Sequence, residues 1–216
     1  MPYAVGGLAV LFVIVTYIIL QGTRAALAWR QAAAGGDVKV IRDIVEASIQ
    51  GWSSQRRPKP VAPEVWRGVQ SMQLADVEAD FVRVSVIAES EYRMENGTWL
   101  EIRNPLQEGF SITVKAADML FYEMPHYRPN RVQVDVYSQY RTESGATTRE
   151  CILSTYTDRD AAKEVDWDEW TAEEIVRALG GVYRLSDTGR PLPVQPIQPP
   201  KAEPPAEATT TAEATS

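Results

Sequence analysis

Two pairs of residues in this chain have the types and the spacing that acid–base chemistry needs. Glu89 and Glu91 are two positions apart in one predicted strand, and Asp135 and Tyr137 have the same spacing in another. Because side chains two apart on a strand point to the same face, each pair could present a general acid and a general base together. The solvated polar face of a sheet produces the same pattern more often, so we expect no catalytic residue here.

A second acidic segment could bind a divalent cation. It contains five acids: Asp158, Asp160, Asp166, Asp168 and Glu169. Their spacing matches no calcium-binding loop, and the segment lacks the glycine that such a loop requires at its turn. We therefore expect Asp158 and Asp166 to cap helices or turns, and we predict neither a metal site nor a cofactor.

The single cysteine and the single histidine are the remaining candidates for chemistry. Cys151 falls in a predicted strand, and His126 falls in the predicted loop MPHYRPN. A catalytic thiol needs a histidine partner, and His126 is the only one in the chain. We interpret Cys151 as a small buried hydrophobic residue and His126 as a surface residue. The sequence contains no glycine-rich phosphate loop and no nucleophile elbow.

The sequence around these residues has the pattern of two β-hairpins. Apolar side chains recur at every second position from 81 to 92, Asn96-Gly97 is a strong hairpin turn, and residues 98–103 predict the returning strand. Residues 131–157 repeat this pattern, and residues 110–124 between the hairpins have helical spacing. The sequence predicts an α+β fold with an antiparallel sheet of about four strands, made of the two hairpins, and helices packed on one face.

The chain divides into four predicted regions: an N-terminal anchor (1–23), juxtamembrane helices with a basic loop (24–60), the α+β domain (61–190) and a tail (191–216). The tail contains seven prolines and no aromatic residue. Because such a segment buries too little apolar surface to offset its ordering entropy, we expect it to be disordered. Its PVQPIQPP stretch could alternatively form a polyproline II ligand.

The anchor is predicted from residues 4–20, which read AVGGLAVLFVIVTYIIL and carry no charge. At about 1.5 Å rise per residue, this run and the three uncharged residues after it span the ~30 Å hydrocarbon core of a bilayer. A signal peptide would have a basic region before the apolar run, and none is present. We therefore predict a single transmembrane helix, although the alanines that follow it leave a cleavage site open.

Basic residues follow this segment, whereas acidic residues dominate the domain. Residues 22–60 carry seven basic and three acidic side chains, and residues 80–190 carry thirteen basic and twenty acidic ones. The positive-inside rule predicts a single-pass protein of the cell membrane with its domain on the cytoplasmic side. The side chains predicted to contact the membrane lipid are Arg24, Arg30, Arg56, Arg57 and Lys59. A domain this acidic is a poor binder of nucleic acid.

These observations together favour a non-catalytic role. We predict that the α+β domain of a membrane-anchored protein binds a protein partner or supports the assembly of a membrane complex. Two alternatives stay open. One is an exported, membrane-tethered module that binds a ligand or the cell envelope, and the other is a hydrolase-type enzyme that uses acidic residues on the sheet face.

Overall fold

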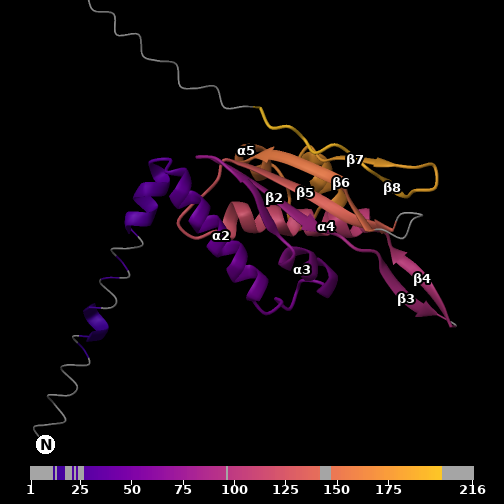
Figure 1. Cartoon of the computed structure of the whole chain (residues 1–216), viewed down its shortest axis with the longest axis horizontal. Helices are drawn as coiled ribbons and strands as arrows, with labels where there is room; N and C mark the ends of the chain where they lie inside the picture. Colours follow the sequence, from indigo (N-terminus) through magenta and orange to yellow (C-terminus); the bar gives the residue numbers. More distant parts are fainter. Residues whose placement is uncertain are drawn as a thin grey trace, which may run out of the picture.

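The computed structural model describes residues 12, 14–17, 21, 23, 27–95, 97–141 and 147–200. They form an α+β fold in which helices lie against a six-stranded mixed sheet (Figure 1). Across the sheet, the strand order is β1 (Gln73–Val77), β2 (Phe81–Ile87), β5 (Arg131–Arg141), β6 (Thr147–Asp158), β7 (Val182–Leu185) and β8 (Pro191–Leu192). Strands β2 and β5 are parallel, and the other neighbouring pairs are antiparallel.

Valine at every second position determines which face of the sheet is buried against helices. The valines of β2 and β5 pair in register: Val82, Val84 and Val86 with Val132, Val134 and Val136. All six have at most 1% of their surface exposed. Since residues two apart share a face, these valines form one apolar layer, and burying each contributes about 1.5 kcal/mol or more.

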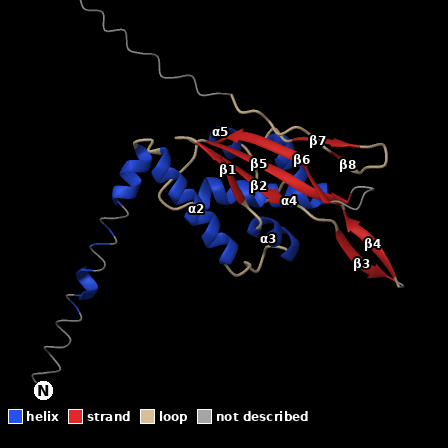
Figure 2. Cartoon of the chain, viewed as in Figure 1, coloured by secondary structure: helices blue, strands red, loops and turns tan. Residues whose placement is uncertain are grey.

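Helix α4 (Pro105–Asp118) packs on this layer through β5 and also contacts α3 and α6. Its N-cap residue Asn104 accepts hydrogen bonds from the backbone N–H groups of Leu106 and Gln107, and proline occupies the first turn, as helix starts prefer. The helix continues into a π-helical turn, η1 (Met119–Glu123). Further helices are α2 (Val38–Ser54), α3 (Pro63–Gln70), α5 (Arg159–Lys163) and α6 (Ala172–Ala178), and residues 27–34 are also helical (Figure 2).

The predicted four-stranded antiparallel sheet of two hairpins is wrong. Strands β3 (Glu91–Glu95) and β4 (Thr98–Arg103) form a separate two-stranded ribbon that extends from the body of the molecule (Figure 1), while β2 joins β1 and β5. The alternation from 81 to 92 is shared by β2 and β3, with a break at residues 88–90. Because α4 supplies the long crossover that a parallel pair requires, the helix brings β5 beside β2.

The predicted transmembrane anchor lies mostly outside the described residues. Residues 27–34 are helical, carry Arg30 and are followed by the Gly35–Gly36 turn. Within the part of the chain that the structure describes, no helix combines the length and the apolar character needed to cross a membrane. This finding contradicts the predictions of a transmembrane anchor, a single-pass protein and a location in the cell membrane.

Residues 191–200, which were assigned to the tail, lie against the sheet. Strand β8 pairs with β7, and the residues after it make hydrogen bonds with β5 and β6 side chains on the face opposite the valine layer. Residues 201–216 lie outside the described residues. The sheet is therefore covered by helices on one face and by a stretch of extended chain on the other.

Gly68→Ala in α3 should destabilise the domain, because α3 and α4 pack too closely for a side chain at this position. A Cβ atom there would lie 2.2 Å from Cδ1 and 2.5 Å from Cγ1 of the buried Ile112. Overpacking of this kind costs about 1–3 kcal/mol. Urea denaturation would measure the loss in the free energy of unfolding.

Gly51→Ala in α2 is the matched control, because a Cβ atom at that glycine meets nothing within 4 Å. Alanine is favoured over glycine inside a helix by roughly 0.5–1 kcal/mol, so this variant should be more stable than the natural chain. Equal stability of the two variants would contradict the close packing of α3 on α4.

Candidate functional site

The structure separates the acidic residues that could have formed a catalytic pair. Glu89 belongs to the connection after β2, is largely exposed and forms an ion pair with Arg67 of α3 at 3.7 Å. Asp135 lies on β5, and only 1% of its side chain is exposed. Glu91 begins β3, and its side chain lies outside the described residues. Glu89 and Glu91 therefore do not share one strand as predicted, whereas Asp135 and Tyr137 both lie on β5.

Asp135 is the centre of a buried hydrogen-bond network that joins three strands. Its Oδ2 accepts a hydrogen bond from Arg83 Nε of β2 at 2.7 Å. Its Oδ1 accepts from Gln133 Nε2 of β5 at 3.0 Å and from Ser154 Oγ of β6 at 2.6 Å. A buried carboxylate needs such partners to offset its desolvation. Three donors hold its two oxygens inside the sheet, so Asp135 has a structural role.

The acidic segment of residues 158–169 has the capping role that we predicted for two of its members. Asp158 Oδ1 accepts hydrogen bonds from the backbone N–H groups of Asp160 and Ala161 at the start of α5. Asp166 Oδ1 accepts in the same way from Asp168 and Glu169. Within the described residues, no cluster of histidine, cysteine or carboxylate side chains could hold a metal ion.

Cys151 is buried in β6, as predicted. Burial, together with the negative charge of Asp135, raises the pKa of the Cys151 thiol to about 12. Since the thiolate is the nucleophilic form, this environment keeps the sulfur protonated and unreactive at neutral pH.

Four of the five basic residues predicted to contact lipid lie within the described residues, and Arg24 lies outside them. Arg56, Arg57 and Lys59 are exposed in the loop between α2 and α3, where Arg57 Nη1 donates to the backbone carbonyl of Val61. Arg30 lies on the helix over residues 27–34 and lines a cavity.

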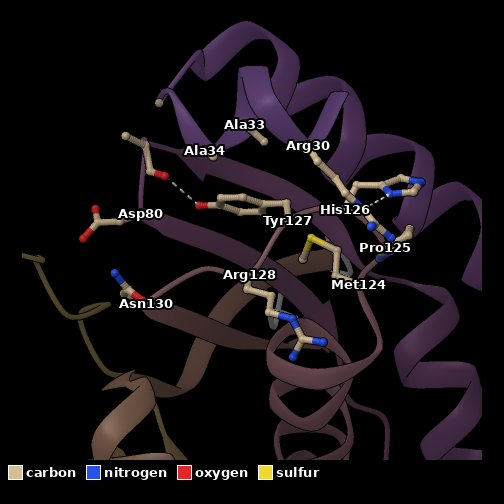
Figure 3. Close-up of a pocket in the computed structure, with 12 residues that line it drawn as sticks. Arg30, Ala33, Ala34, Asp80, Met124, Pro125, His126, Tyr127, Arg128 and Asn130 are labelled. Carbon is tan, nitrogen blue, oxygen red and sulfur yellow. Dashed lines mark hydrogen bonds between the residues drawn. The ribbon is translucent and has the colours of Figure 1, made fainter. Parts of the chain in front are cut away.

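This cavity, which we name the His126 groove, has a volume of about 800 Å³ (Figure 3). It lies between the helix over residues 27–34, the turn from β1 to β2, and the loop after η1. Its lining residues are Arg30, Ala33, Ala34, Gly36, Ala79, Asp80, Met124, Pro125, His126, Tyr127, Arg128 and Asn130. In the view of Figure 3, Arg30 and His126 lie together at one end, Asp80 lies at the other, and Tyr127 lies between them.

His126 has a backbone conformation that side chains rarely adopt. Its φ is +64°, and it is the one residue other than glycine with a positive φ within the described residues. Such strain costs of the order of 1–3 kcal/mol and is concentrated at functional sites, as are short π-helical turns like the η1 turn that precedes this loop. Arg30 Nε donates to His126 Nδ1 at 3.3 Å. In this arrangement the imidazole accepts a hydrogen bond from a cation, so no carboxylate orients it as a base.

Tyr127 forms the floor of the groove and is held in place. Its hydroxyl donates a hydrogen bond to the backbone carbonyl of Ala79 at 3.1 Å, and burial followed by the nearby charge of Asp80 raises the pKa of the phenol. The carboxylate of Asp80 is itself paired with the guanidinium of Arg131. The one acidic side chain lining the groove is thus neutralised, which leaves Arg30 and Arg128 to set its charge.

A second cavity, of about 310 Å³, lies where α3 and α4 meet. Its buried Glu108 is 3.6 Å from Nη1 of Arg103, and Arg67 and Glu89, which also line it, pair with each other. Glu64 is a further carboxylate in the lining, so this cavity does not suit an acidic ligand.

No family model, no curated protein and no solved structure matches the chain. Likeness to a known protein therefore says nothing about its function. The groove itself was not predicted, because its residues come from three separate segments. The signals that point to it are the Gly35–Gly36 turn, which ends the helix over residues 27–34, and the loop that contains the only histidine.

Asp135→Asn should destabilise the domain by roughly 3 kcal/mol or more, the usual cost of removing one partner of a buried ion pair. The asparagine amide cannot accept from Arg83, Gln133 and Ser154 at once, because one of its two polar atoms is a donor. Urea denaturation measures the effect. Glu46→Gln is the control, since its ion pair with Arg42 on α2 is exposed, and such pairs contribute little. Comparable losses in both variants would contradict the structural role of Asp135.

Proposed function

We propose that this chain is a non-catalytic protein-binding domain, and that the His126 groove receives an acidic segment of the partner protein. The observation that carries this proposal is the combination of an apolar floor with two arginines whose charge is not neutralised inside the groove. This is a proposal about the groove and does not involve a membrane.

The floor of the groove supplies apolar contact area. Ala33, Met124 and Tyr127 are each 6% exposed and line the cavity. Because little of their own surface is exposed, a partner side chain placed over them would gain mainly by burying its own apolar surface, at about 25 cal/mol per Å². A floor of buried side chains also keeps its shape, so little ordering entropy is lost on binding.

The rim of the groove supplies positive charge. Arg30 uses Nε to bond His126, and its two terminal nitrogens have no hydrogen-bond partner within the described residues. Arg128 has neither a hydrogen-bond nor an ion-pair partner in the described part of the chain. Guanidinium groups bind carboxylates in a bidentate geometry, so both arginines suit glutamate or aspartate side chains. Because the chain as a whole has a net charge of −7, a local basic rim also selects which face a partner approaches.

The openness of the rim favours a protein over a small molecule. Pro125, His126, Arg128 and Asn130 are exposed, whereas a small-molecule site usually buries most of its ligand. Catalysis is disfavoured by the partners of the titratable groups nearby: His126 bonds Arg30, Tyr127 bonds a backbone carbonyl, and Asp80 bonds Arg131.

Arg30→Glu should weaken partner binding at least tenfold, which corresponds to about 1.4 kcal/mol, because it places a carboxylate where an acidic segment docks. For the test, a photo-crosslinking amino acid replaces Ala34, which lines the groove. The full chain carries a purification tag and is expressed in the cells from which it comes. The crosslinked partner is then purified, and its affinity is measured directly against each variant at two salt concentrations. Binding should weaken as salt rises, because rim charges are screened.

Arg184→Glu in β7 is the matched control, since it makes the same charge reversal on an exposed residue outside the groove. This variant should bind the partner as the natural chain does. Equal affinities for Arg30→Glu and Arg184→Glu, or no protein crosslinked from position 34, would refute the proposed docking site.

A further inference from the structure

The face of the sheet opposite the helices already holds a peptide segment, which belongs to the chain itself. We name residues 193–198, PVQPIQ, the strap. In Figure 1 the chain after β8 runs back along β6 before it leaves the sheet. The strap follows the last strand, carries no charge and contains two prolines, so it favours an extended, polyproline-like backbone.

Three hydrogen bonds hold the strap, and two of them bind both main-chain groups of one residue. Ile197 N–H donates to Ser154 Oγ at 3.0 Å, and Ile197 C=O accepts from Gln133 Nε2 at 2.9 Å. Val194 N–H donates to the backbone carbonyl of Cys151 at 2.9 Å. Because these side chains bind main-chain groups, recognition depends more on the backbone conformation of the bound segment than on the identity of its side chains.

Asp135 determines which group each of these side chains presents. The Ser154 hydroxyl gives its hydrogen to Asp135 Oδ1, so its oxygen is left to accept from a peptide N–H. The Gln133 amide gives one hydrogen to the same carboxylate oxygen, so its second hydrogen is directed to a peptide carbonyl. One buried carboxylate thereby creates an adjacent donor and acceptor, which match the N–H and C=O of an extended residue.

The strap does not satisfy this face completely. Gln133 is fully buried, yet its Oε1 has no hydrogen-bond partner within the described residues. Leaving a buried acceptor unpaired is unfavourable. The strap therefore leaves one acceptor of the Gln133 amide unused.

We propose that this face is a binding site for an extended, uncharged, proline-containing segment of a partner protein, and that the strap fills it in cis. A strap on the same chain has a high effective concentration, so it keeps weaker competitors out. Because it lies after the last strand and is held by three hydrogen bonds, it can leave without breaking a strand pair of β1, β2, β5 and β6. A partner segment of the same chemistry then occupies the same donor and acceptor.

We expect Cys151 to report the position of the strap. Its carbonyl is bonded to Val194, and its side chain is 5% exposed. Release of the strap should expose the sulfur to a thiol reagent. As the chain contains no other cysteine, the rate of labelling reads this face alone.

The experiment uses full-length chain with Ile197→Pro, which removes the N–H that bonds Ser154. Gln195→Pro is the matched control, because the N–H of Gln195 forms no hydrogen bond within the described residues. We expect Cys151 to be labelled at least tenfold faster in Ile197→Pro than in Gln195→Pro. A synthetic peptide of residues 193–200 should bind Ile197→Pro, slow its labelling again, and bind the natural chain at least tenfold more weakly.

The control peptide carries proline at the position of Ile197 and should give no protection. If Ile197→Pro is labelled no faster than the control, a second variant that ends at Leu192 is tested with the same peptides. Circular dichroism confirms that this shortened variant is folded. A folded variant with an open face that neither binds the peptide nor is protected by it would overturn the proposal. Binding that Ser154→Ala does not weaken would overturn it as well.

Discussion

A carboxylate buried between strands is the constraint on which the rest of this structure depends. Moving an ionised carboxylate from water into a protein interior costs several kcal/mol, so Asp135 is tolerated only with good partners. Arg83, Gln133 and Ser154 supply them from the three central strands. This requirement fixes β2, β5 and β6 in register, with valines on the opposite face available for the helices. The same requirement orients the side chains that hold the strap.

The partners of the charged groups also limit what the chain can do. Asp135 and Asp80 are each bonded to an arginine, and the one histidine accepts a hydrogen bond from another. Such pairs stabilise the fold and occupy the groups that acid–base catalysis would need. The function that we propose is recognition, through an open groove with a basic rim beside His126 and a sheet face that holds an extended segment. The two surfaces suit different partner chemistries, one acidic and one uncharged.

Features that depend on neighbours in the sequence were predictable, and features that depend on distant contacts were not. The caps at Asp158 and Asp166 follow from local hydrogen bonding, and the burial of Cys151 follows from the strand around it. The partner of β2 depends instead on where α4 returns the chain, which the alternation of residues 81–92 does not encode. The same limit applies to the strap, since proline-rich composition does not indicate that a buried serine and glutamine bind its backbone. The predicted anchor rested on apolar composition alone, and no described helix suits a membrane span.

The most direct test of this account is a double-mutant cycle between Asp135 and Ile197, read as the free energy of unfolding in urea. The central claim is that Asp135 acts on the strap by orienting Ser154 and Gln133, which make the hydrogen bonds with Ile197. Asp135→Asn and Ile197→Pro should therefore be coupled by about 0.5–3 kcal/mol, so that Ile197→Pro costs much less when Asp135 has already been replaced. Strictly additive losses would contradict the account, because they would show that the buried carboxylate and the strap stabilise the chain independently.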